Sequence, residues 1–366
     1  MWNLAAVAGG AAAVLVVLTD VFVSVIVPRA ERSAVRVSRL LALGLWALWP
    51  RIAYRMYPRD DRAREGLLSV FAPSFLVTLL LMWLVILVLG WGLVFYGLHD
   101  ELRPAGLTFG DCVYFAGASF LTIGYGDITP VFAGARMLSI VCAASGLGVV
   151  AVVISFLFAI FGAFQRRETF VVTIGARAGV PPSGVGLLAV HAYAGLRYDL
   201  AGVFREGQHW TADVMESHLA YPILAYFRSS HDYESWVGTL GALLDAASLV
   251  VSTLEPQGLS NSQTLGQARV MYELGRHLTY DFAHYFDLEH DESTPGIERS
   301  EFHEALERLQ AEGYQLVDES AAWAKFSELR SAYASALNAM ARWLEIPPVQ
   351  WVGDRSILSP HASTPS

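Results

Sequence analysis

The chain has 366 residues, 54% of them hydrophobic, and a formal net charge of −9, and this length allows two or more folding units of roughly 100–200 residues each. Residues 1–167 carry 13 Arg, no Lys and 9 acidic residues, whereas residues 168–366 carry 12 basic and 25 acidic residues. Nucleic-acid binding needs clustered Lys and Arg opposite phosphates. The acidic half lacks such a cluster, so nucleic acid is not an expected partner.

Three apolar segments, residues 4–27, 71–98 and 137–164, reach the roughly 20 residues that a helix needs to cross a bilayer. The N-terminus lacks the basic region of a signal peptide, so we expect the first segment to be a membrane span. Asp20 is its one charged residue, and the sequence assigns it no role.

A shorter apolar segment, residues 40–49, is flanked by arginines and is too short to cross. Four arginines precede it at steps of three and four, on one face of a helix. They are Arg29, Arg32, Arg36 and Arg39. Because Arg-rich short loops prefer the cytoplasm, we expect an amphipathic helix on the inner surface, contacting anionic lipids. A voltage sensor, with arginines inside a long apolar span, and a fourth crossing are the alternatives.

Between the second and third spans, Thr108 and Asp111 form a capping-box pattern ahead of a helix of about three turns. That helix is too short to cross, so residues 122–127 leave it at membrane depth. Non-helical backbone is tolerated there only where it is buried in protein or lines water. Gly124 and Gly126 occupy every second position of this segment, and glycine permits positive φ. Its carbonyls can then replace the water shell of a cation.

The motif TIGYGD at residues 122–127, with a preceding short helix and flanking spans, resembles the selectivity filter of potassium channels, over about residues 69–164. The resemblance implies that potassium is the transported ion and that no organic cofactor is needed. It implies that backbone carbonyls bind dehydrated potassium, that the last two residues form the outer mouth, and that the tyrosine ring braces the filter. The residues concerned are Thr122, Ile123, Gly124, Tyr125, Gly126 and Asp127.

The filter motif occurs once in the chain. A pore of this kind needs four such loops around one axis, so a homotetramer is expected. In the third span, Gly146 and Gly148 lie near the middle. They form either a gating hinge, as the resemblance implies, or a site of close helix packing.

The predicted fold class is all-α, with a membrane pore domain of the potassium-channel type and a cytoplasmic all-α domain. Helical spacing recurs over residues 236–254, 265–286, 302–316 and 321–344. Residues 170–175 fit either a strand or a continuation of the third span. The expected domains are residues 1–65 with the first span and surface helix, 66–167 with the pore, 168–358 in the cytoplasm, and a disordered tail at 359–366.

His277, Asp281 and His284 recur at i, i+4 and i+7 on one helix face, a spacing that predicts a metal site or a proton sensor. A dinucleotide-binding glycine motif and the common hydrolase motifs are absent from the sequence, so an enzyme is not expected. The leading hypothesis is a multi-pass potassium channel of the cell membrane. The alternatives are a membrane-anchored scaffold with a non-conducting pore and a membrane enzyme.

Overall fold

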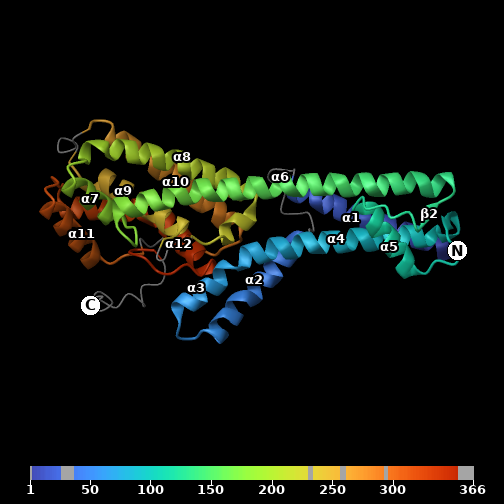
Figure 1. The fold of residues 1–366 in the computed structure, drawn as a ribbon. Helices are drawn as coiled ribbons and strands as arrows, with labels where there is room; N and C mark the ends of the chain where they lie inside the picture. The colour runs from blue at the N-terminus through green and yellow to red at the C-terminus, as the bar shows by residue number, and fades with distance from the viewer. Residues whose placement is uncertain (1, 26–36, 230–233, 256–260, 292–295, 353–366) are drawn as a thin grey trace. The chain divides into compact units, whose positions relative to one another are not determined.

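The computed structural model describes residues 2–25, 37–229, 234–255, 261–291 and 296–352. The described residues are mainly helical (Figure 1), which confirms the predicted all-α class. The chain divides into an N-terminal unit, Met1–Gly162, and a C-terminal unit, Ala163–Ser366. The arginines at positions 29, 32 and 36 and the tail at 359–366 lie outside the described residues, as does the side chain of Arg39.

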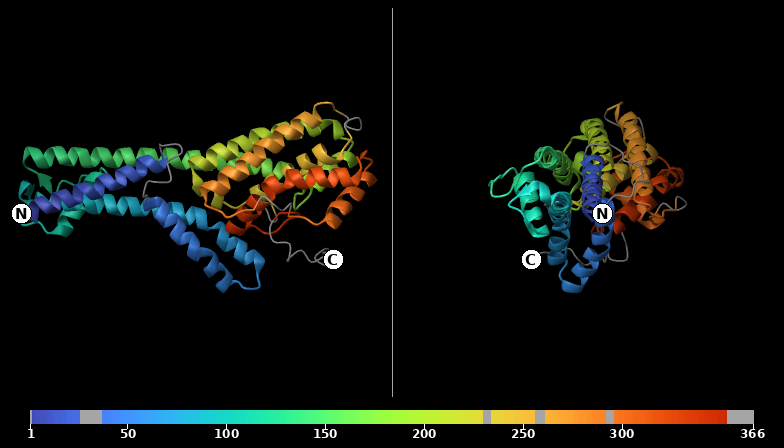
Figure 2. Two further views of the ribbon diagram at one scale, coloured as in Figure 1. Left: turned by 180° about the vertical axis from the view of Figure 1, so that it is seen from behind. Right: turned by 90° about the vertical axis from the view of Figure 1, so that its right-hand side faces the viewer.

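The N-terminal unit is built on three long apolar helices. In chain order its elements are α1 (Trp2–Val25), α2 (Val37–Met56), α3 (Asp61–Ser69), α4 (Phe71–Gly97), the 3₁₀ turn η1 (His99–Glu101), β1 (Leu102–Arg103), α5 (Phe109–Phe120), β2 (Thr129–Pro130) and the first part of α6 (Ala133–Ala178). Helix α1 lies alongside α4, and α2 and α3 form a hairpin (Figures 1 and 2). The short strands pair antiparallel, with Leu102 opposite Pro130.

Close packing and one buried polar cluster join α1 to α4. A Cβ atom added to Gly10 would lie 2.5 Å from the carbonyl oxygen of Gly90, so the two backbones touch. Deeper in the unit, the Asp20 carboxylate accepts hydrogen bonds from the Trp83 indole at 2.8 Å and from the Ser38 hydroxyl at 3.2 Å. A buried carboxylate requires such partners. Asp20 therefore links α1, α2 and α4.

Four helical stretches in the described part of the chain are long and apolar enough to cross a membrane: Leu4–Val25, Asp61–Gly97, Ala133–Ala178 and Trp236–Thr253. The last is α9 of the C-terminal unit, where nearly every residue is buried. It is therefore a core helix. Helix α2, which contains the segment at residues 40–49, is not among the four.

The C-terminal unit packs its helices around α9. It contains the end of α6, α7 (Gly184–Tyr193), η2 (Arg197–Asp199), α8 (Leu200–Ala220), η3 (Pro222–Tyr226), α9, α10 (Thr264–Tyr285), α11 (Arg299–Ala311) and α12 (Glu319–Trp343). Residues 170–175 are helical and continue α6. Helix α11 is shorter than the pattern predicts, because the chain turns away at Gly313, whose φ is +78°.

A buried ion pair fastens α12 to α9. The Arg330 guanidinium donates to the Asp245 carboxylate at 3.0 Å, and both side chains are essentially inaccessible to solvent. The Tyr333 hydroxyl donates to the same carboxylate at 2.6 Å. Arg330 also donates to the carbonyl of Trp351 and so holds the turn that follows α12.

Candidate functional site

The candidate site begins with the short helix α5, which is fixed at its N-terminus and along one side. The Thr108 hydroxyl accepts from the backbone N–H of Asp111, and the Asp111 carboxylate accepts from the backbone N–H of Thr108. The predicted capping box is thus present. A Cβ atom on Gly92 of α4 would lie 2.6 Å from the Val113 side chain. Helix α5 is therefore seated directly against the backbone of α4.

The segment that follows α5 is pinned to its last turn by backbone hydrogen bonds. The N–H groups of Ile123 and Gly124 both donate to the carbonyl of Ala118, at 2.8 and 3.2 Å. The N–H of Thr122 donates to the carbonyl of Ser119 at 3.0 Å. These bonds fix where the non-helical segment starts, and they place it at the C-terminal end of α5, where the helix dipole is negative.

Backbone conformation alternates along this segment. Thr122, Gly124 and Gly126 have φ values of +56°, +60° and +83°. Glycine adopts this left-handed region at little steric cost, whereas a threonine there is strained by about 1–3 kcal/mol. Alternation of this kind allows successive carbonyls to face one side, which is the requirement for a column of cation sites.

The tyrosine of the motif contacts α5, as the resemblance implies. The rings of Tyr125 and Tyr114 are stacked with centroids 6.3 Å apart. Tyr125 nevertheless remains 70% exposed in the single chain. Every residue from Leu121 to Asp127 is exposed there as well.

The residues that follow the segment are hydrogen-bonded to Glu101 of η1, a contact that the sequence does not predict. The Glu101 carboxylate accepts from the backbone N–H of Ala135 at 2.9 Å, in the first turn of α6. The N–H of Val131 donates to the carbonyl of Glu101. An acid near a helix N-terminus satisfies backbone donors that have no partner within the helix. The two residues lie 34 positions apart, so no local spacing indicates the contact.

The two candidate hinge glycines of α6 differ in their surroundings. A Cβ atom on Gly146 would lie 1.9 Å from the carbonyl oxygen of Phe120, at the end of α5, whereas one on Gly148 would meet nothing within 4 Å. Nearby, the Cys142 thiol lies 3.8 Å from the carbonyl of Ala116. For Gly146 the close-packing interpretation therefore accounts for the glycine, and α6 is one continuous helix through both positions.

The three residues of the predicted metal site do not converge on one point. His277 and Asp281 approach to 3.4 Å, while the His284 ring is stacked on Tyr280. Residues seven apart on a helix are separated by about 10 Å along its axis. Among the residues that the structure describes, no three His, Cys, Asp or Glu side chains form a group that could hold a metal ion.

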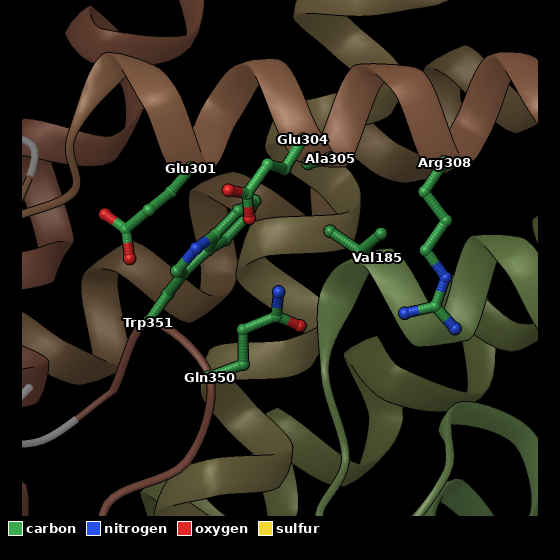
Figure 3. A pocket seen from close by; sticks show the side chains of 7 residues that line it. All are labelled: Val185, Glu301, Glu304, Ala305, Arg308, Gln350 and Trp351. Carbon is green, nitrogen blue, oxygen red and sulfur yellow. The ribbon is translucent and has the colours of Figure 1, made fainter. Parts of the chain in front are cut away.

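A surface cavity of about 220 Å³ lies in the C-terminal unit (Figure 3). Helix α11 contributes both acidic and basic side chains to it, and the turn after α12 contributes an aromatic ring. The lining residues are Val185, Glu301, Glu304, Ala305, Arg308, Gln350 and Trp351. None of the residues singled out in the sequence lines this cavity, and its lining holds no Ser, Cys or His that could act as a nucleophile.

Comparison with known proteins finds a family model that matches the part of the chain around the TIGYGD segment. Residues 81–162 match the family model described as "Ion channel". They run from within α4 through α5 and the TIGYGD segment into α6. The match confirms the resemblance to the channel pore family over these residues, and the N-terminal unit therefore contains an ion-channel domain.

The chain is also similar to the uncharacterized membrane protein YdjJ of Bacillus subtilis (strain 168). The two are 23% identical over 245 residues, which cover 65% of this chain and 68% of that protein. No solved structure matches the chain. Together with the apolar helices, these likenesses identify an integral membrane protein.

Proposed function

We propose that the chain forms a homotetrameric potassium channel whose C-terminal unit lies in the cytoplasm and gates it. Potassium is the transported ion, no organic cofactor takes part, and the chain has no enzymatic activity. The observation that carries the proposal is the alternation of left-handed backbone at Thr122, Gly124 and Gly126 in a segment held by the last turn of α5. Backbone carbonyls in such a segment can coordinate a dehydrated cation.

Two features support a tetramer. One chain supplies one filter segment, and a ring of carbonyls around an axis needs four. In addition, the side chains of Ile123 and Tyr125 are 48% and 70% exposed in the single chain. Neighbouring subunits around the axis would cover these apolar surfaces.

The continuity of α6 supports gating by the C-terminal unit. This helix runs from Ala133 to Ala178 as one element, and its last part belongs to the C-terminal unit. A helix transmits rotation and translation along its axis better than a flexible linker does. The arginines that flank the first span favour a cytoplasmic location for this unit and contact with anionic lipids.

The test is potassium flux into liposomes that contain the purified full-length protein. We expect flux from the unaltered protein and none from Gly126→Asp, which places a side chain and a charge at a left-handed position of the filter. Asp281→Asn, a partly exposed side chain of α10 that is remote in sequence from residues 122–127, serves as the control and should conduct normally. A tetramer that carries no flux would favour the scaffold alternative.

A further inference from the structure

The C-terminal unit holds the end of α6 through one buried arginine. Arg167 is 1% exposed. Its guanidinium donates to the carbonyls of Leu224 and Phe227 at 2.8 and 2.7 Å, in and just after η3. Its own carbonyl accepts from the Trp210 indole of α8. A buried charge is tolerated only when its donors are satisfied in this way. Arg167 therefore fixes α6 to α8 and η3.

The fourth contact of Arg167 is chemically distinctive. One guanidinium nitrogen lies 3.1 Å from Nε2 of His218 on α8. A guanidinium donates hydrogen bonds and accepts none, so Nε2 must be the unprotonated acceptor. The other ring nitrogen, Nδ1, faces the Ser217 hydroxyl at 3.1 Å. The contact therefore requires neutral His218.

The surroundings of His218 contain few charges. Its ring is 1% exposed and lies against Trp236 of α9 and Phe282 of α10. The charged group that faces it is Arg167 of α6, whose guanidinium also pairs with the carboxylate of Glu168 at 2.9 Å. Burial, and then the nearby Arg167 charge, hold the pKa of His218 well below its usual value of 6.5.

We propose that Arg167 and His218 form a proton-sensitive clasp that couples the C-terminal unit to the pore-lining helix α6. When His218 takes up a proton, Nε2 loses its lone pair for the hydrogen bond and two positive charges face each other. The clasp then loosens. It is closed at neutral pH and opens on acidification. This inference rests on the proposed channel function, for which it names the regulating stimulus.

His218→Gln is the informative variant, because the amide oxygen of glutamine can take the place of Nε2 as acceptor and does not titrate. His191→Gln is the matched control. His191 is 2% exposed, its Nδ1 donates to the carbonyl of Leu187, and burial lowers its pKa as well. It lies on α7 and makes no contact with Arg167 among the hydrogen bonds of the described residues.

Potassium flux is measured in liposomes from about pH 7.5 down to about pH 4.5, a range that extends well below the usual pKa of histidine because the pKa of His218 is lowered. We expect the flux of the unaltered protein and of His191→Gln to change severalfold over this range, and that of His218→Gln to stay within about twofold. An unaltered protein that conducts without pH response, or a His218→Gln protein that responds like it, overturns the clasp while leaving the channel function intact.

Thermal unfolding of the full-length protein in detergent tests the clasp without conduction. Since the folded-state pKa of His218 is lowered, its contribution to stability is present at neutral pH and is lost as the pH falls below about 6.5. Acidification should therefore lower the unfolding temperature of the unaltered protein by at least about 2 °C more than that of His218→Gln. Equal decreases in the two proteins contradict the proposal, whether or not flux is seen.

Discussion

The two units use polar groups in opposite ways. In the N-terminal unit, the functional segment presents backbone atoms, and all seven residues from Leu121 to Asp127 are exposed in the single chain. In the C-terminal unit, charged side chains are buried and satisfied by one another, as in the pair of Arg330 with Asp245. In the proposed channel, other subunits and the transported ions would complete the exposed backbone segment. In the proposed channel, the buried ion pairs of the C-terminal unit would make it rigid enough to act on the pore.

The largest effect on stability should come from breaking the buried ion pair of Arg330 with Asp245. Arg330→Met leaves the Asp245 carboxylate buried without its cation, and we expect a loss of about 3–5 kcal/mol in the free energy of unfolding. Arg276→Met is the control, because the pair of Arg276 with Glu273 lies on an exposed surface and such pairs contribute about 0–1 kcal/mol. Chemical denaturation in detergent measures both. Similar losses would show that burial does not distinguish the two pairs.

In the N-terminal unit, the matching prediction concerns close packing between α6 and the end of α5. Gly146→Ala drives a methyl group into the carbonyl of Phe120, and overpacking of this kind is destabilising by about 1–3 kcal/mol. Gly148→Ala meets nothing within 4 Å and should be neutral or slightly stabilising, because alanine favours a helix by about 1 kcal/mol over glycine. The yield of tetramer and its unfolding temperature report the difference. Equal tetramer yields and unfolding temperatures for the two variants would contradict the close-packing interpretation of Gly146 and favour a hinge.

The cap of α5 should contribute less. Thr108→Ala removes the side-chain acceptor for the backbone N–H of Asp111, with an expected loss of about 0.5–2 kcal/mol. Thr108→Ser retains the hydroxyl and should be close to the unaltered protein. Because α5 supports the filter segment, we also expect faster loss of flux on heating for the alanine variant alone.

The smallest effect is expected in the contact between α1 and α4. Trp83→Phe removes the N–H that donates to Asp20, and it also replaces the buried indole with a smaller aromatic ring. Hydrogen bonds between membrane helices contribute about 0.6 kcal/mol on average. A double-mutant cycle with Asp20→Asn measures the coupling between the two side chains. A coupling energy near zero would mean that packing at Gly10 and Gly90 holds α1 without help from the polar cluster.

The same contrast explains how much of the molecule the sequence predicts. The spans, α5 with its capping box and the TIGYGD segment depend on residues that are adjacent or regularly spaced, so local physical rules find them. The contacts of Glu101 with Ala135 and of Arg330 with Asp245 join residues 34 and 85 positions apart. No periodicity indicates such pairs, because folding alone brings them together.

The histidines show the same limit. His277 and His284 attract attention because they share a helix face, yet they do not converge on one point. His218 has no spacing that singles it out, and its contact with Arg167 spans 51 positions. A spacing rule finds residues on one helix, whereas the environment that changes the chemistry of a histidine is built from several helices.

The most direct test of the central claim is the reversal potential of the purified protein in a planar bilayer, with potassium on one side and sodium on the other. A filter of backbone carbonyls at residues 122–126 predicts a reversal potential strongly displaced in the direction of potassium selectivity, and no current from Gly126→Asp. A reversal potential near zero, with sodium carried as readily as potassium, would contradict the account.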